Sequence, residues 1–180
     1  RHHDTTPTRR QFREFVVPSL VRQPGVQAFN WVPRVSDAQR DAHERAIRAD
    51  GFPDYRITER DTEGRTVASG GRAAYFPVVY RESLADADPR GALGFDIASD
   101  PRRRIALERA QDSGLPAATG RLRLVSAAGD RTGFWVVAPV YAPGLIPTTA
   151  PERSRQLIGF AQGVFQVKAL QPVYRLSLLS

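Results

Sequence analysis

The chain contains no cysteine and no methionine, and only three histidines among its 180 residues. Without cysteine it forms no disulfide and offers no thiol nucleophile or thiolate metal ligand. This absence fits an oxidising compartment as well as a reducing one. No apolar run approaches the roughly 20 residues that a membrane helix needs, and the first residues lack the apolar core of a signal peptide. Because methionine is missing even from position 1, we expect the sequence to be a piece of a longer protein.

Lysine is nearly absent as well. Lys168 is the single lysine among 26 basic residues, so arginine supplies the net charge of +7. The arginines are spread along the chain and interleaved with acidic residues, which argues against a nucleic-acid-binding face. The one arginine triple, at residues 102–104, falls in the first turn of a predicted helix, where positive charge opposes the helix dipole. We interpret it as a solvated face, with an anionic ligand or membrane headgroups as the alternatives.

Catalytic chemistry has few candidates in this chain. Catalysis needs a nucleophile, a base or metal ligands that converge on one point. His43 is the single histidine beyond the first three residues, whereas zinc sites need three or four clustered ligands. Carboxylate pairs such as Asp86 and Asp88 remain as candidates, but they fall in a predicted surface turn. We therefore expect no enzyme, no metal site and no cofactor. An Arg-rich nucleic-acid-binding domain is the first alternative function, and a hydrolytic enzyme is the less favoured one.

The first half of the chain predicts two helices and a strand. Apolar residues at helical spacing predict a helix over residues 11–21, interrupted at Pro18. Ser36 and Gln39 are spaced as a capping box and predict a second helix that ends before Gly51. Between them Trp31 is expected to anchor the core, with its indole N–H in need of an acceptor. Residues 54–61 alternate in polarity and predict a half-buried strand.

The stretch over residues 75–119 predicts a strand–strand–helix–strand unit. Its two β-rich runs are residues 73–82 and 92–98. Asp100 as N-cap and Gly114 as left-handed exit limit the helix that follows. The expected buried face of this helix is narrow, and it consists of Ile105, Ala106, Leu107 and Ala110. We expect Asp96 to cap or brace the turn that leads into the helix.

The C-terminal part predicts a hairpin and a further strand. Residues 121–126 and 132–140 read as a hairpin whose second strand is central in the sheet. Residues 141–151 read as an irregular loop. Gly159 and Gly163 favour a strand with close neighbours over a helix across residues 155–167. The tail, 168–180, is weakly amphipathic and could resume a helix.

Taken in order, seven phrases of this sequence resemble the CHASE domain, the extracytoplasmic sensor region of transmembrane histidine kinases and diguanylate cyclases. They cover residues 24–167. The phrases are PGVQAFNWVPRV from Pro24, YFPVVY from Tyr75, LGFDIASDPRR from Leu93, ALERAQDSG from Ala106, TGRLRL from Thr119, APVY from Ala138 and GFAQGVF from Gly159.

The resemblance implies an α+β fold: a long N-terminal helix followed by two PAS-like antiparallel-sheet subdomains. Residues 1–23 would be the stalk helix, where His2 and His3 suggest a tag remnant. Residues 24–140 would form the membrane-distal ligand-binding subdomain, and 141–180 the membrane-proximal subdomain with the C-terminal stalk. It further implies flanking membrane helices, a periplasmic or extracellular position, and a homodimer through the N-terminal helix.

The resemblance also implies a small-molecule ligand in the distal subdomain. Thr119 matches a threonine that lines the pocket of plant cytokinin receptors. Bacterial members usually carry an asparagine near Asp88, so we do not expect a cytokinin-like ligand. An anionic ligand could meet Arg81 through a bidentate contact, unless Arg81 is an exposed strand residue, and the aromatic candidates have plain core packing as their alternative. The expected lining residues are Tyr80, Arg81, Asp88, Phe95, Ala110, Thr119, Phe134 and Val136.

Overall fold

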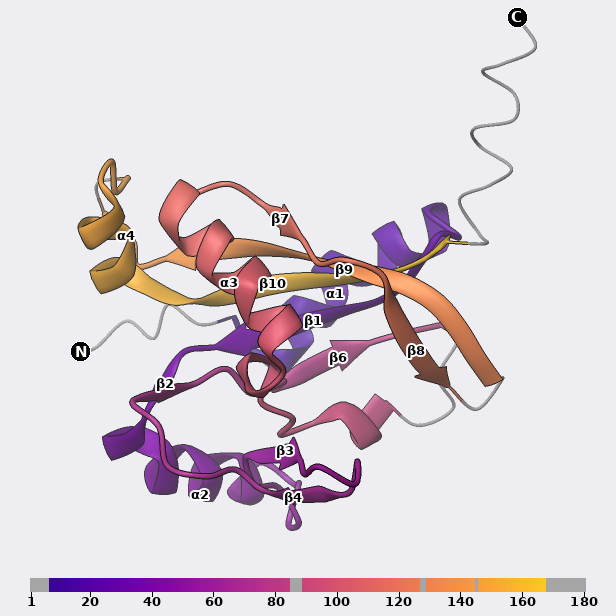
Figure 1. Ribbon diagram of the computed structural model, residues 1–180, viewed down its shortest axis with the longest axis horizontal. Coiled ribbons are helices and arrows are strands. Elements are labelled where there is room, and N and C mark those ends of the chain that lie inside the picture. The colour runs from indigo at the N-terminus through magenta and orange to yellow at the C-terminus, as the bar shows by residue number, and fades with distance from the viewer. Residues whose placement is uncertain (1–6, 85–88, 127–128, 145, 168–180) are drawn as a thin grey trace, which may run out of the picture.

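An antiparallel sheet of six strands, with helices on both of its faces, forms the centre of the molecule (Figure 1). The computed structural model describes residues 7–84, 89–126, 129–144 and 146–167. The elements of these residues, with 3₁₀ helices written η, are α1 Arg9–Arg22, β1 Val26–Pro33, β2 Val35–Ser36, η1 Asp37–Gln39, α2 Arg40–Ala49, β3 Thr58–Arg60, β4 Thr66–Ala68, β5 Ala74–Tyr75, β6 Tyr80–Glu82, η2 Pro89–Ala92, η3 Ile97–Ser99, α3 Pro101–Ser113, β7 Ala117–Ala118, β8 Leu122–Ser126, β9 Gly129–Tyr141, α4 Ala150–Gln156 and β10 Leu157–Gln166.

The strands of the main sheet run in the order β6-β1-β10-β9-β7, and β8 also pairs with β9. The last strand of the sequence, β10, therefore lies between the first strand and the predicted central strand β9, and it pairs antiparallel with both. Close neighbours, backbone at Gly159 and aromatic rings at Gly163, explain its two glycines. A Cβ at Gly159 would lie 2.5 Å from the carbonyl oxygen of Val32, and one at Gly163 would lie 2.8 Å from the ring of Phe165. This confirms the strand with close neighbours that the sequence predicts.

Helix α3 covers the face of the sheet that we call the front face. The helix begins and ends as predicted: Asp100 accepts a hydrogen bond from the backbone N–H of Arg102, and Gly114 has a φ of 73°. Ala106, Leu107 and Ala110 pack against Val32, Val137 and Phe160 of the sheet. The predicted buried face is wrong at one position, because Ile105 is 49% exposed.

Helix α1 covers part of the opposite, back face. Phe12, Val16 and Leu20 are its buried residues, and the first two pack with Trp31 of β1. The helix runs through Pro18 without the predicted interruption. The physical reason is that Pro18 is exposed, so water can satisfy the carbonyl group that loses its intrahelical partner. With 14 residues α1 is an ordinary helix, and the long N-terminal helix is not confirmed.

A smaller layer, formed by α2 and two short sheets, lies beside the main sheet (Figure 1). Strand β2 pairs with β5, and β3 pairs with β4. Val35, Ile57 and Tyr75 form the buried cluster that joins them. Strand β3 is shorter than the predicted strand over residues 54–61, although Tyr55 and Ile57 are buried as that pattern implies.

One predicted strand is wrong. Residues 92–98 form turns and the 3₁₀ helix η3 instead of a strand. The reason lies in Gly94, which has a φ of 82° and so turns the chain, and in Asp96, whose side chain accepts from the N–H of Ala98 and starts η3. The described residues between 142 and 149 form the irregular loop that the sequence predicts, and α4, which the sequence does not predict, begins after it at a capping box of Thr149 and Glu152.

The main sheet contains strands from both sides of residue 140, since β10 pairs with β9 and β1. The α+β class is confirmed, but two PAS-like subdomains are not. The boundaries at residues 23 and 140 stay a prediction, and the predicted tail helix lies outside the described residues. No helix within the described ranges is long and apolar enough to cross a membrane.

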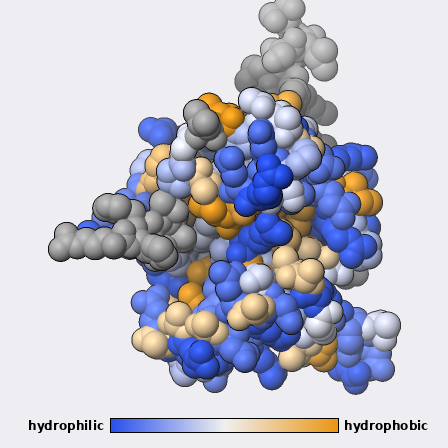
Figure 2. All heavy atoms as spheres, turned by 90° about the vertical axis from the view of Figure 1, so that its left-hand side faces the viewer, coloured by the Kyte–Doolittle hydropathy of each residue, from blue (hydrophilic) through white to orange (hydrophobic). Residues whose placement is uncertain are grey.

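At the end of the molecule that carries α4, hydrophilic residues dominate the surface and hydrophobic residues form separate patches (Figure 2).

Candidate functional site

A chain of polar side chains crosses the front face of the sheet at its centre. Arg81 of β6, Asn30 of β1 and Gln162 of β10 stand directly opposite one another in the strand register. The guanidinium of Arg81 donates to Oδ1 of Asn30 at 3.1 Å. Nδ2 of Asn30 donates to Oε1 of Gln162 at 2.6 Å. Asn30 is 3% exposed and Gln162 is 1% exposed, so this relay is buried.

The chemistry of arginine fixes the direction of the relay. A guanidinium can only donate, so Asn30 must present its oxygen to Arg81 and its NH₂ group to Gln162. Gln162 must then present its oxygen to Asn30. Its Nε2 group is left over, buried and without an acceptor among the described residues. An unsatisfied buried donor costs about 1–3 kcal/mol, so the relay ends in a group that an incoming acceptor would stabilise.

Trp135 of β9 supplies a second donor beside the first. Gln162 pairs with Val137 and Trp135 with Val164, so Gln162 and Trp135 are diagonal neighbours on one face of adjacent strands. The indole Nε1 of Trp135 is also buried, and no described residue accepts its proton. Two N–H donors of this part of the sheet therefore lack partners.

Arg103 covers the ring of Trp135 from the first turn of α3. Its guanidinium carbon lies 3.9 Å from the Trp135 ring centroid and 5.1 Å from that of Phe95, close enough for cation–π attraction. Burial lowers the pKa of Arg103 to about 10, partly offset by Asp100, whose carboxylate lies 3.5 Å from the Arg103 side chain. Arg103 thus stays a cation at neutral pH. We call Arg81, Asn30, Gln162, Trp135 and Arg103 the donor site.

Four of the predicted lining residues lie on the donor-site side of the sheet. Arg81 begins the relay, and Phe95 lies under the guanidinium of Arg103. Thr119 is bonded to the backbone of Trp135 in both directions: its Oγ1 accepts from the Trp135 N–H at 2.9 Å, and its own N–H donates to the Trp135 oxygen at 2.8 Å. Ala110 is fully buried in the core between α3 and the sheet.

The sheet separates these residues from three others. Tyr80 packs against Phe12 of α1, with ring centroids 5.8 Å apart. Phe134 stacks on Phe165 at 5.2 Å, and Val136 lines a groove beneath α1. These three lie on the back face because successive strand residues alternate between the faces. Asp88 lies outside the described residues.

Sequence reasoning missed the residues that make the donor site polar. Asn30 and Gln162 are 132 positions apart, and each stands between apolar or small residues in a mostly apolar strand. A polar residue within such a strand is the one signal that could have pointed to them. Arg103 was expected to face water with the rest of its triple. Its side chain is 19% exposed, whereas that of Arg102 is 75% exposed and that of Arg104 is 53% exposed.

The back face carries an apolar groove of about 390 Å³. It runs between α1 and strands β1, β9 and β10, and its wall includes Phe15, Phe29 and Trp31. Asn30 and Gln162 also border it, although strand alternation turns their side chains to the front face. Phe15 is 83% exposed. The indole N–H of Trp31 is buried and lacks an acceptor within the described part of the chain, so the partner that the sequence leads us to expect is not found there.

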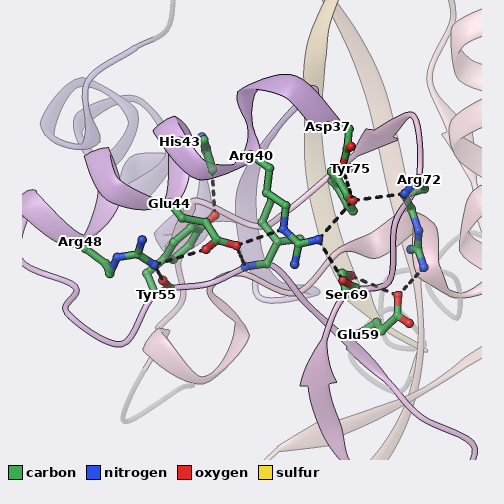
Figure 3. A network of polar contacts seen from close by, with 11 residues as sticks. Asp37, Arg40, His43, Glu44, Arg48, Tyr55, Glu59, Ser69, Arg72 and Tyr75 are labelled. Atoms are coloured by element: carbon green, nitrogen blue, oxygen red, sulfur yellow. Dashed lines mark hydrogen bonds and ion pairs between the residues drawn. The ribbon is translucent and has the colours of Figure 1, made fainter.

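A second polar network links α2 to the smaller layer (Figure 3). The carboxylate of Glu44 accepts from Arg40, Arg48 and the backbone N–H of Ile57. Hydrogen bonds to these three donors lower the pKa of Glu44 despite its partial burial. His43, expected at the surface, is half-buried, and its Nε2 lies 3.0 Å from the hydroxyl of Tyr55.

The other half of this network ends at two carboxylates. Arg72 pairs with Glu59 and, at 2.7 Å, with Asp96. Asp96 also accepts from the N–H groups of Phe76 and Ala98, which confirms its predicted bracing role. Since these charged groups are paired within the network, the network fastens α2 and the loops together. Within the described ranges no three acidic or histidine side chains gather as a metal site would require.

Comparisons with known proteins place the chain. A family model of the CHASE domain matches residues 5–175. A search of curated proteins gives no match. Among solved structures, a chain named methyl-accepting chemotaxis protein X is similar at 12% sequence identity and a TM-score of 0.42, covering 94% of this chain and 50% of that one. CHASE domains are sensor domains of signalling receptors and not catalysts, and they lie outside the cytoplasm. The match over nearly the whole length shows that this chain belongs to the CHASE family.

Proposed function

We propose that this chain is the extracytoplasmic small-molecule sensor domain of a transmembrane receptor and that its ligand binds at the donor site. One observation carries the proposal: the buried relay from Arg81 through Asn30 ends in an unsatisfied donor on Gln162. Buried donors are nearly always satisfied in folded proteins, and each exception calls for an explanation. A ligand acceptor at this point is the explanation that fits a sensor family.

Strand β1 offers a route from the donor site to α1. Asn30 points to the front face, and its neighbour Trp31 packs on the back face against Phe12 and Val16. Any shift of β1 on ligand binding would therefore act directly on the contact with α1. Packed interfaces have discrete arrangements, so a small shift can select between two positions of a helix. In the full receptor this helix would pass the signal toward membrane helices and an output domain.

Dimerisation through α1 is part of the same proposal. Phe15 and Val21 of α1 are 83% and 66% exposed. Large exposed apolar residues favour a protein contact where they gather in a patch. A second copy of α1 is the expected partner in a homodimer.

Thermal unfolding in the presence of a metabolite library tests the ligand proposal. A ligand at 100 times its dissociation constant adds about 2.7 kcal/mol to stability, which raises the melting temperature of a chain of this size by roughly 5–10 °C. Gln162→Leu should abolish the shift, because leucine cannot donate. Val136→Met, a change in the back groove, is the control and should leave the shift intact.

Two results would contradict the proposal. The first is a library in which no small molecule stabilises the wild-type domain. The second is a ligand whose effect survives Gln162→Leu and disappears in Val136→Met, because that result moves the site to the back groove. Circular dichroism of each variant shows that it is folded before its binding is judged.

A further inference from the structure

From the charges and donors of the donor site we infer that its ligand is a small organic acid, bound as the carboxylate. This inference rests on the proposed function and names the chemistry of the same site. Its first support is the set of unsatisfied groups. Nε2 of Gln162 and Nε1 of Trp135 are both N–H donors, and the described residues offer neither of them an acceptor.

The position of these donors suits a carboxylate. They belong to diagonal neighbours on adjacent strands of one sheet face, so a single small ligand with two acceptor oxygens is the simplest partner for both. The polarity cannot be reversed by rotating the amides, because Arg81 fixes the direction of the relay at its far end. A ligand that brings only N–H groups would leave both donors unsatisfied.

The charge around the site is the second support. Arg103 lies over the ring of Trp135 and is the one inward-facing member of the arginine triple. Burial is the main cause that lowers the pKa of Arg103, and Asp100, 3.5 Å from its side chain, is the carboxylate that opposes this shift. A buried guanidinium over the Trp135 ring favours an anion over a neutral or cationic ligand.

This arrangement divides the three arginines at residues 102–104 into two exposed side chains and one that faces the sheet. Two of its side chains face water, as a solvated charge run does. The third, Arg103, is held at the ring faces of Trp135 and Phe95. Of the two alternatives to a solvated face, the anionic ligand fits this inward side chain, since membrane headgroups would require exposed ones.

A panel of small carboxylic acids, each with its primary amide, its amine counterpart and its phosphate analogue, tests the inference on the wild-type domain. The readout is the indole N–H region of the ¹H–¹⁵N NMR spectrum, which contains one signal from each tryptophan. We expect an acid to move the Trp135 signal downfield and to leave that of Trp31 in place, because Trp31 reports on the back groove. Trp135→Phe assigns the two signals.

Charge variants separate the acid from its neutral partner. Arg103→Gln should weaken binding of the acid at least tenfold and change binding of the amide less than threefold. Arg104→Gln, an exposed neighbour on the same helix, is the matched control and should change neither. Gln162→Glu keeps the acceptor for Asn30 but replaces the outward donor by a negative charge, so it should abolish binding of the acid in a domain whose spectrum stays dispersed.

The outcomes distinguish the inference from the proposed function. If amides, amines or phosphates bind in preference to the acids and move the Trp135 signal, the carboxylate inference is wrong and the sensor site stands. If a ligand moves only the Trp31 signal, the site itself is wrong. If no member of this panel binds but a molecule of the metabolite library does, the inference fails alone. If nothing binds in either experiment, the proposed function fails as well.

Discussion

Gly94→Ala is the substitution whose effect the structure specifies most closely. Gly94 has a φ of 82°, and a Cβ at this position would lie 2.1 Å from the carbonyl oxygen of Arg56. The backbone around it is bonded on both sides: its N–H donates to Val78 at 2.8 Å, and its carbonyl accepts from Thr58 at 2.9 Å. The segment it turns carries Phe95, which supports Arg103.

The expected loss of stability has two parts. A left-handed conformation costs a residue with a Cβ about 1 kcal/mol. The clash with backbone cannot be relieved by rotating a side chain, so the two strands of chain must separate and lose the hydrogen bonds to Val78 and Thr58, worth about 1 kcal/mol each. The sum is about 3 kcal/mol, which corresponds to a fall in melting temperature of roughly 6–12 °C for a chain of this length.

Gly51→Ala separates the two parts. Gly51 has a φ of 96°, but nothing lies within 4 Å of the Cβ that alanine would add. It should therefore lose only the conformational part, about 1 kcal/mol. Urea unfolding of the wild type and both variants measures the difference, with unchanged m values showing that the unfolding reaction is the same. Equal losses in the two variants would refute the reasoning, since they would mean that the contact with Arg56 costs nothing.

Three further predictions concern the polar groups around the fold. Asp96→Ala should lower the free energy of unfolding by about 3–5 kcal/mol. The change leaves the buried N–H groups of Phe76 and Ala98 unsatisfied and removes one of the two carboxylates that pair with Arg72. Urea unfolding measures the loss, and a loss under about 1 kcal/mol would contradict the prediction. Glu152 should titrate near the pKa of about 2 to which the backbone N–H groups of Thr149 and Thr148 lower it, so its stabilising effect is present above pH 4.5 and lost as the pH falls toward 2. NMR titration checks this. Thr149→Ala keeps the backbone N–H but removes a hydroxyl that also lowers the pKa, so it should raise the pKa only in part. Burial lowers the pKa of His43 below 6.5, so the free energy of unfolding should fall as the pH drops from 6.5 toward that lower pKa, and a His43→Asn variant should lose this dependence.

The parts of the fold that local residues decide could be predicted from the sequence. Helix α3 is the best example, since Asp100 and Gly114 set its ends through contacts within a few positions. The hairpin of β8 and β9 follows from alternation and turn residues in the same way, and Gly159 and Gly163 favour the strand β10 over a helix. The ordered phrases across residues 24–167 were enough to indicate the CHASE family, which the family model confirms.

Residues 92–98 show where local pattern fails. Their apolar residues alternate as in a strand, and Phe95 and Asp96 do form isolated bridges to Thr58 and Pro77. The segment cannot extend those bridges, because Gly94 turns the chain and Asp96 uses its carboxylate to start η3. Both effects depend on neighbours that are distant in sequence, such as Arg56 and Arg72. Tertiary contacts override the strand propensity here.

The donor site could not be predicted, because it exists only in the register of four strands. Arg81, Asn30 and Gln162 come from three strands that the sequence separates widely, and a slip of one residue in β10 would turn Gln162 to the back face. Once the strand register is formed, the chemistry of the side chains determines the direction of the hydrogen bonds. Arg81 can only donate, and the two amides each pass one donor onward, so the polarity at Gln162 is set before any ligand arrives. If a ligand binds there as proposed, its acceptor would be selected through a side chain that need not touch the ligand at all.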